Sequence, residues 1–313
     1  MLMSLWIGLA AAQTEYPARP VRVVAPFPPG QGTELIARAL AQQFTQTMGQ
    51  SFYVDNKPGA SGIIGTEFVK NSAPDGYTLL VAGSGPLAIN MSMYSKLPYD
   101  SLRDFQPIGM IAAVPNVLVV AKDFPANNLR EVLAHVRQNP GKVNYASSGV
   151  GVPNHLIMEL LKAATGLEIT HVPYKGASAS VTALMAGEVS LMFETSAAVV
   201  PHIRGGRIKV IAVSSPKRAL SLPDVPTVAE SGVAGFGAQG WSALFVPAGT
   251  PRPIVQKLNG ELTAALAKPE VKKRLIDLGV DPVEMTLEQT AAYVKSEVEN
   301  WAKAVKQSGA RAD

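Results

Sequence analysis

The chain of 313 residues contains no cysteine. This absence argues against thiolate catalysis, iron–sulfur clusters and cysteine zinc sites, and it leaves no disulfide to hold the fold. Lysine and arginine are scattered and the net charge is only +4, so the basic stripe typical of a nucleic-acid-binding protein is missing. No run reaches the ~18 apolar residues that a membrane-spanning helix needs. We therefore expect a protein that neither binds nucleic acid nor spans a membrane.

Signatures of catalysis are missing as well. The sequence has no G-x-S-x-G, no G-x-x-x-x-G-K-[ST] and no G-x-G-x-x-G motif. Its four histidines form no H-x-x-x-H or H-E-x-x-H pair: His135, His155, His171 and His202. Glu34 and Glu194 each lie where a strand-like run meets a helix-like one, and a lone carboxylate there more often serves the helix N-terminus than acid–base chemistry. We expect no metal, no cofactor and no enzymatic activity.

The N-terminal segment MLMSLWIGLAAAQ is apolar from Leu5 to Leu9 and ends in three alanines before Gln13. This pattern resembles the end of a secretory signal that is cut after Ala12. The usual basic n-region is missing, which fits a truncated or misassigned start. We expect residues 1–12 to be a signal-peptide remnant and the mature chain to be exported.

Strand-like and helix-like runs alternate along most of the remaining chain. In the first part, strands are expected over 21–26, 52–55 and 77–82, and helices over 34–48 and 64–72. This order predicts a parallel sheet covered by helices. A second set repeats the pattern, with helices over 129–138, 155–164, 180–186 and 197–204 and strands over 143–146, 169–172, 189–193 and 209–213. Three helix-like runs, 253–267, 270–278 and 287–307, close the chain.

The closing helices have no sheet of their own, and their simplest partner is the first sheet. This predicts a discontinuous domain 1 of residues 13–114 and 243–313, and a domain 2 of residues 115–242. The chain would cross between them near Val114 and Ala243. Two such crossover strands form a hinge, and a hinge implies a cleft. The predicted fold class is α/β, with two lobes that each hold a mostly parallel sheet flanked by helices.

Loops rich in glycine and serine follow the strands of both lobes. Ligands of parallel sheets bind outside the carboxyl ends of the strands, where helix N-termini also point. Backbone amides that donate to a charged acceptor contribute about 1.5–3 kcal/mol each, so roughly four to six of them could hold a small anion without any arginine. For any single loop, turn and capping chemistry is the favoured explanation. Loops of one character at one sheet edge favour an anion site between the lobes.

Several strings resemble a known family: VVAPFPPGQGTELIARALA, VDNKPGASGIIGTEFVKNSAPDGYTLL, NYASSGVGVPNHL, HVPYKGASASVTALMAGEVSLMF, LPDVPTVAESG and FVPAGTP. They are similar to the solute receptors of tripartite tricarboxylate transporters, the Bug-type periplasmic binding proteins. The resemblance runs from about Tyr16 to Gln307. It implies a type II periplasmic-binding-protein (Venus flytrap) fold, a periplasmic location, and hinge closure on a small carboxylate that is then delivered to membrane permease subunits. We expect a monomer.

Matched by motif, the resemblance also implies which residues bind the ligand. In the first lobe they are Pro29, Gly30, Gln31, Gly32, Thr33, Ala60, Ser61, Gly62, Ile63, Ile64 and Ser84. In the second lobe they are Ser147, Ser148, Gly149, His155, Pro173, Tyr174, Lys175, Gly176, Glu194, Thr195 and Ser196. The chain departs from the family pattern at Gln31, Glu34 and Asn154, and the amide of Gln31 is expected close to the ligand.

Four points stay open at the level of sequence. Family members bind diacids, citrate, amino acids and nicotinate-like or aromatic carboxylates, and this pocket could suit any of them. The same closure could serve a sensor that contacts a signalling partner. An enzyme on the same bilobal scaffold, with His155 or Glu34 as acid or base, is the less favoured alternative. The apolar stripe of the helix over 287–307 predicts core packing, with partner binding as the alternative.

Overall fold

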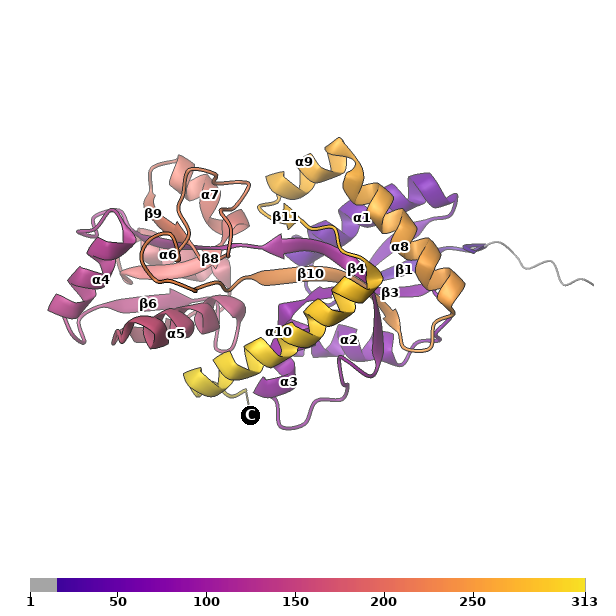
Figure 1. Cartoon of the computed structure of the whole chain (residues 1–313), viewed down its shortest axis with the longest axis horizontal. Coiled ribbons are helices and arrows are strands. Elements are labelled where there is room, and N and C mark those ends of the chain that lie inside the picture. The colour runs from indigo at the N-terminus through magenta and orange to yellow at the C-terminus, as the bar shows by residue number, and fades with distance from the viewer. Residues whose placement is uncertain (1–15, 313) are drawn as a thin grey trace, which may run out of the picture.

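The computed structural model describes residues 16–312, and the predicted signal peptide over residues 1–12 lies outside the described residues. The strands form two sheets, one of order β11-β4-β10-β3-β1-β2 and one of order β7-β6-β8-β5-β9. Figure 1 shows the two sheets, each with its own helices, at opposite ends of an elongated molecule. The strands are β1 (Val21–Ala25), β2 (Phe52–Asn56), β3 (Thr78–Gly83), β4 (Phe105–Val114), β5 (Asn116–Ala121), β6 (Asn144–Ser147), β7 (Thr170–Pro173), β8 (Leu191–Thr195), β9 (Ile208–Val213), β10 (Gly240–Pro247) and β11 (Asp281–Pro282).

Helices cover both sheets. They are α1 (Gly32–Met48), the short turns η1 (Ala60–Gly62) and η2 (Gly85–Ile89), α2 (Ile63–Lys70), α3 (Asn90–Met93), α4 (Leu129–Gln138), α5 (Pro153–Thr165), α6 (Ala177–Met185), α7 (Ser196–Arg204), α8 (Arg252–Ala267), α9 (Pro269–Asp277) and α10 (Leu287–Ser308). Of the residues that the structure describes, no helix has the length and apolar character needed to cross a membrane.

The neighbouring strands β1 and β3 of the first sheet are buried on both faces because they are almost entirely apolar. Val23 and Leu79 lie on one face, in a core with Phe44 of α1. Val24 and Leu80 lie on the other face, in a second core. Successive side chains of a strand point to opposite faces, so a continuous apolar run fits a sheet with helices on both sides.

Both sheets are mixed, which corrects the expectation of mostly parallel sheets. β1 pairs in parallel with β2 and β3, and β6 with β7 and β8. β10 is antiparallel to β3 and β4, and β5 is antiparallel to β8 and β9. The βα repeats give the parallel pairs. In the first sheet, the antiparallel strands β4 and β10 carry the chain out of the lobe and back into it, so they run in opposite directions.

The two lobes are joined at the crossovers. β4 ends at Val114 and β5 begins at Asn116, with Pro115 between them. The returning strand β10 begins at Gly240, which pairs with Val114. Both connections therefore lie side by side, and Figure 1 shows β10 spanning the gap between the two groups of elements.

The last helix, α10, bridges the molecule. Val294, Trp301 and Val305 are buried, as the apolar stripe predicts. The helix packs on β4, η2 and α3 of the first lobe. It also packs on α5, which covers strands of the second sheet. Figure 1 shows it running along β10 towards the second lobe. This helix is thus a core element that contacts both lobes.

Candidate functional site

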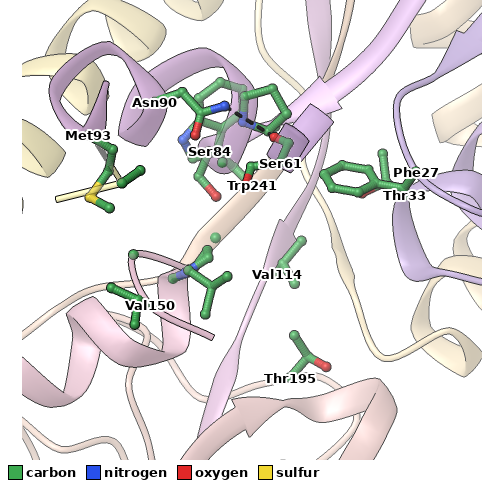
Figure 2. A pocket seen from close by; sticks show the side chains of 18 of the residues that line it. Phe27, Thr33, Ser61, Ser84, Asn90, Met93, Val114, Val150, Thr195 and Trp241 are labelled. Carbon is green, nitrogen blue, oxygen red and sulfur yellow. Dashed lines mark hydrogen bonds between the residues drawn. The ribbon is translucent and has the colours of Figure 1, made fainter. Parts of the chain in front are cut away.

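A cavity of about 240 Å³ lies between the lobes, beside the crossovers. Figure 2 shows it from close by. Its walls come from three places: the strand ends and helix starts of the first sheet, the crossover strands, and the loop before α5 with the end of β8. The lining residues are Phe27, Thr33, Ser61, Gly83, Ser84, Gly85, Pro86, Asn90, Met93, Tyr94, Val114, Asn116, Val150, Gly151, Val152, Pro153, Thr195, Gly240, Trp241 and Ala312.

Three serine and threonine side chains of the first lobe reach the cavity. Thr33 lies in the first turn of α1, and Ser84 stands where β3 passes into the helical run of η2 and α3. Ser61 has a φ of 53° and follows Ala60 at 46°. Left-handed backbone at two consecutive non-glycine residues is costly and clusters at functional sites. The strained turn therefore marks this edge of the cavity.

Asn90 of α3 holds that turn in place. Its Nδ2 donates to the carbonyl oxygen of Ser61 at 3.1 Å, and the hydroxyl of Tyr94 donates to Ser61 Oγ at 3.3 Å. Figure 2 shows Ser61, Ser84 and Asn90 on one side of the cavity. Sequence reasoning did not single out Asn90 or Tyr94. Their place in the helix that follows Ser84 is the signal that could have found them.

The crossover wall consists of Val114, Asn116, Gly240 and Trp241. β3 and β10 approach so closely that a Cβ on Gly83 would overlap the carbonyl oxygen of Trp241 and lie 2.9 Å from its carbonyl carbon. Glycine is needed here for close approach of two backbones. Gly83 is the last residue of β3, so the loop that follows the strand begins at Ser84.

The second lobe contributes a mainly apolar wall, the segment Val150–Pro153, together with Thr195 at the end of β8. Gly151 has a φ of 76°, and a Cβ there would lie 3.0 Å from Sδ of Met93. Met93 belongs to the first lobe, so this contact closes one side of the cavity across the two lobes. Neither Met93 nor the valines were predicted.

Behind Thr195, Glu194 anchors a buried polar cluster. Its carboxylate accepts hydrogen bonds from the hydroxyl of Ser148, from Asn154 Nδ2 at 2.8 Å and from the amide of Thr195 at 2.8 Å. Burial raises the pKa of Glu194, and these hydrogen bonds oppose the rise. Glu194 and Ser148 are therefore paired with each other and do not line the cavity. Asn154, the departure from the family pattern, is one of the donors.

The carboxylate of Glu34 also has its partners within the protein. Its Oε2 accepts from the amide of Gly30 at 2.9 Å, and its carboxylate pairs with Arg38 one turn later in α1. This confirms that the carboxylate at this junction serves the helix N-terminus.

His155 is buried and forms part of a stacked aromatic group. Its ring centroid lies 4.1 Å from that of His171, which in turn lies 4.7 Å from Tyr145. His155 Nδ1 accepts a hydrogen bond from the amide of Gly151 at 3.1 Å. Burial lowers the pKa of His155 to about 4, and burial also lowers the pKa of His171. His155 thus supports the segment that lines the cavity instead of lining it.

Many loop amides that were expected to hold the ligand are paired within the protein. The amide of Gly30 donates to Glu34, and that of Gly149 donates to Ser147 Oγ at 3.2 Å. The same holds for the amides of Gly62, Ser148, Tyr174, Gly176 and Ser196. This corrects the expectation that free main-chain donors from both lobes form the site. Neighbouring side chains and carbonyl groups of the protein already accept the hydrogen bonds of these amides.

Of the predicted ligand residues, Thr33, Ser61, Ser84 and Thr195 are brought together around the cavity. The others lie outside its lining. Eight of these are exposed: Pro29, Gly30, Gln31, Gly32, Ala60, Ile64, Pro173 and Lys175. Ten are partly or fully buried: Gly62, Ile63, Ser147, Ser148, Gly149, His155, Tyr174, Gly176, Glu194 and Ser196. The amide of Gln31 is thus not at the cavity, since Gln31 is the exposed residue that precedes α1.

The cavity has hydroxyl, amide and apolar walls. Within residues 16–312, no charged side chain lines it, and no three His, Cys, Asp or Glu side chains are arranged to hold a metal ion. His155 and Glu34, the two groups on which the enzyme alternative depends, are engaged elsewhere. Such a surface can bind a small molecule between the lobes.

Comparisons with known proteins agree with this geometry. Residues 36–310 match the model of the tripartite tricarboxylate transporter family receptor. Protein BugT of Bordetella pertussis is 38% identical over 307 residues, which cover 97% of this chain and 94% of that protein. Two solved structures share the two-lobed α/β fold, which confirms the predicted fold class. One is an R. palustris protein with adipate, with a TM-score of 0.85, 36% identity, and coverage of 94% of this chain and 99% of that chain.

The other is MatC from Rhodopseudomonas palustris with bound malate, with a TM-score of 0.79 and 33% identity, covering 93% of this chain and 100% of that chain. The resemblance noted in the sequence is therefore confirmed over most of the chain. The chain belongs to the family of tripartite tricarboxylate transporter receptors.

Proposed function

We propose that this chain is a periplasmic solute-binding protein, which captures a small organic carboxylate by closing its lobes and delivers it to the permease of a tripartite transporter. The observation that carries the proposal is the cavity itself. It lies between two lobes beside two adjacent crossover strands, and both lobes contribute to its walls. Each lobe alone covers one side of a ligand, so closure buries it.

The carboxylate would be held by the first lobe. Thr33, Ser61 and Ser84 supply hydroxyl donors at the cavity. The amides in the first turn of α1 have no acceptor within the helix, and the positive end of the helix dipole favours an anion there. Hydrogen bonds to a charged group contribute about 1.5–3 kcal/mol each, so a few of them hold an acid without any basic side chain.

The lobes would move about the crossovers. We propose that residues 13–114 with 243–313 form one domain and residues 115–242 the other, with Pro115 and Gly240 at the hinge. The contact between Met93 and Gly151 closes the mouth on one side. Periplasmic location and delivery to a permease are supported by membership of the family. The carboxylate class is supported by the adipate and malate of the two related structures.

A ligand screen tests the proposal. One or more mono-, di- or tricarboxylates should raise the melting temperature in a saturable way, because a ligand at a hundredfold excess over its Kd stabilises the folded state by about 2.7 kcal/mol. Ser84→Ala should weaken the binding of that acid by about tenfold or more, since it removes a donor to a charged group. Ser178→Ala, at an exposed site on α6, is the matched control and should leave binding unchanged.

The proposal would be contradicted if no carboxylate at millimolar concentration shifted the melting temperature. It would also fail if the bound acid were chemically converted, which NMR of the mixture would reveal. In cells that lack the gene, uptake of the acid should return with the wild-type chain and less so with Ser84→Ala.

A further inference from the structure

Resting on the function proposed above, we propose that the short segment after α10, Gly309–Ala312, forms one wall of the ligand cavity and retains the bound acid. The inference comes from the path of this segment, which turns back from the end of the last helix to the mouth of the cavity. It concerns how long an acid stays bound, and not whether an acid binds.

The segment leaves α10 through a left-handed turn. Gly309 follows the helix with a φ of 65°, a conformation that glycine adopts without a steric cost. The amide of Ala310 then donates to Ser308 Oγ at 3.1 Å, and the side chain of Ala310 is buried in a core that contains residues of both lobes. Figure 1 shows the chain turning from the end of α10 towards α3. The turn therefore directs the segment back across the protein.

A hydrogen bond fastens the segment to the first lobe. The amide of Ala312 donates to the carbonyl oxygen of Met93 at 3.1 Å. Met93 is the last residue of α3, where a carbonyl group has no donor within the helix. Segments that follow the last helix of a domain usually fray unless contacts hold them. Two contacts hold this one, the burial of Ala310 and the hydrogen bond of Ala312.

Ala312 lies at the mouth of the cavity. It is exposed, yet it belongs to the residues that line the cavity. Its partner Met93 lines the same cavity and lies close to Gly151 of the second lobe. Arg311, between the two alanines, is exposed and does not belong to the lining. The segment thus adds backbone and a methyl group, but no charge, to the wall beside the point where the lobes meet.

A wall at this place acts on the escape of the ligand. α10 packs on elements of both lobes, so the segment is carried by the part of the molecule that joins them. An acid that leaves past Met93 has to displace the segment. The wall also keeps water from the hydrogen bonds that Ser61 and Ser84 offer to the acid, and such bonds are stronger where water is excluded. Since affinity differences between related complexes lie mostly in the dissociation rate, we expect the loss of the wall to speed dissociation.

Two variants remove the wall in different ways. A chain that ends at Gly309 lacks the segment altogether. Ala312→Pro removes only the amide that donates to Met93, because proline has no N–H, and it leaves Ala310 in the core. Ala248→Pro is the matched control: Ala248 is also exposed, and its amide donates to the carbonyl oxygen of Asp104 at 3.0 Å, beyond the end of β10 that lies away from the cavity.

Binding kinetics test the inference. Calorimetry with succinate, malate, adipate and citrate finds the acid that the wild type binds most tightly, and stopped-flow fluorescence of Trp241, which lines the cavity, then follows its binding and release. We expect Ala312→Pro to raise the dissociation rate constant about three- to tenfold, the equivalent of one lost hydrogen bond. The shortened chain should raise it by at least as much. The association rate constant should change less in both variants, and Ala248→Pro should leave both constants unchanged.

Melting temperatures check that the variants fold, and Ala312→Pro decides the test if the shortened chain does not. Unchanged dissociation in the shortened chain, or in Ala312→Pro where that variant decides, would overturn the inference and leave the proposed function intact. Equally fast dissociation from Ala248→Pro would also overturn it, because lost stability and not the lost wall would be the cause. An effect of the shortened chain alone would overturn the role of the hydrogen bond to Met93. If the wild type binds none of the four acids, the proposed function fails and this inference fails with it.

Discussion

Single glycines shape the cavity at two points where an added Cβ would come very close to a neighbouring atom. Gly83 lets β3 approach β10, and Gly151 lets the second lobe meet Met93 of the first. The two differ in kind. Gly83 concerns packing inside one sheet, whereas Gly151 also requires a left-handed backbone, with a φ of 76°.

Gly83→Ala should therefore destabilise the protein. The new Cβ would overlap the carbonyl oxygen of Trp241 and force β3 and β10 apart, and overpacking of this kind costs about 1–3 kcal/mol or more. Urea unfolding followed by circular dichroism measures the effect. Gly85→Ala is the control two residues later: no heavy atom lies within 4 Å of the added Cβ, and its free energy of unfolding should stay within about 0.5 kcal/mol of the wild type. Equal stability of the two variants would contradict this account of Gly83.

At the scale of elements, His155 in the first turn of α5 stacks on His171 of β7, and burial makes this pair a poor proton acceptor. His155 lies between Gly151 of the cavity segment and His171 of β7, and Tyr145, Glu159 and Lys162 are the other titratable groups close to the pair. Glu159 pairs with Lys162 at 2.7 Å and accepts from the hydroxyl of Tyr145. This carboxylate is thus engaged, and although it favours the charged imidazoles, burial outweighs it and lowers the pKa of both histidines.

The pair predicts a loss of stability in acid. Burial lowers the pKa of His155 to about 4 in the folded state, from an ordinary value of 6.5. Below pH 6.5 the unfolded chain binds a proton that the folded chain does not, so the free energy of unfolding falls between pH 6.5 and about 4. For His155 alone the loss is roughly 3 kcal/mol.

Urea unfolding at several pH values between 7.5 and 4.5 checks this prediction. His155→Asn keeps an acceptor in the place of Nδ1 and does not titrate, so its stability should depend less on pH than that of the wild type. His171 retains part of the dependence, because burial lowers its pKa as well. The same slope in the variant and the wild type would contradict the role of His155.

Local patterns were enough to predict most elements but not their directions. The helix expected over 34–48 is α1 at Gly32–Met48, and the one expected over 287–307 is α10 at Leu287–Ser308. Apolar periodicity and glycine at the helix ends carry that information. The short strand β11 and the antiparallel direction of β10 were missed, because strand pairing depends on segments far apart in the sequence.

The site was predictable only in part for the same reason. Ser61, Ser84 and Thr195 follow strands in serine- or threonine-containing strings, and the structure places them at the cavity. The pairing of Ser148 with Glu194 joins residues 46 positions apart, so no local sequence pattern indicates it. Met93 reaches Gly151 across the lobes, which only the tertiary arrangement reveals.

At the scale of the whole molecule, the two lobes are joined by few strands yet share a core. β4–β5 and β10 connect them side by side, while α10 packs on elements of both. One hydrophobic cluster includes Leu80 of the first sheet, Phe193 of the second and Trp301 of α10. Closure about the crossovers would therefore have to keep this shared core intact. We expect the two lobes to move least relative to one another where α10 joins them.

The central claim is that uncharged groups of the first lobe hold a carboxylate between the lobes. A crystal structure with a bound acid, found by the ligand screen, tests it most directly. The account predicts carboxylate oxygens within hydrogen-bond distance of Thr33, Ser61 or Ser84 and the rest of the acid between the lobes, near Val150. A carboxylate ion-paired with a lysine or arginine, for example Lys175 or Arg311, or an acid bound outside this cavity, would contradict it.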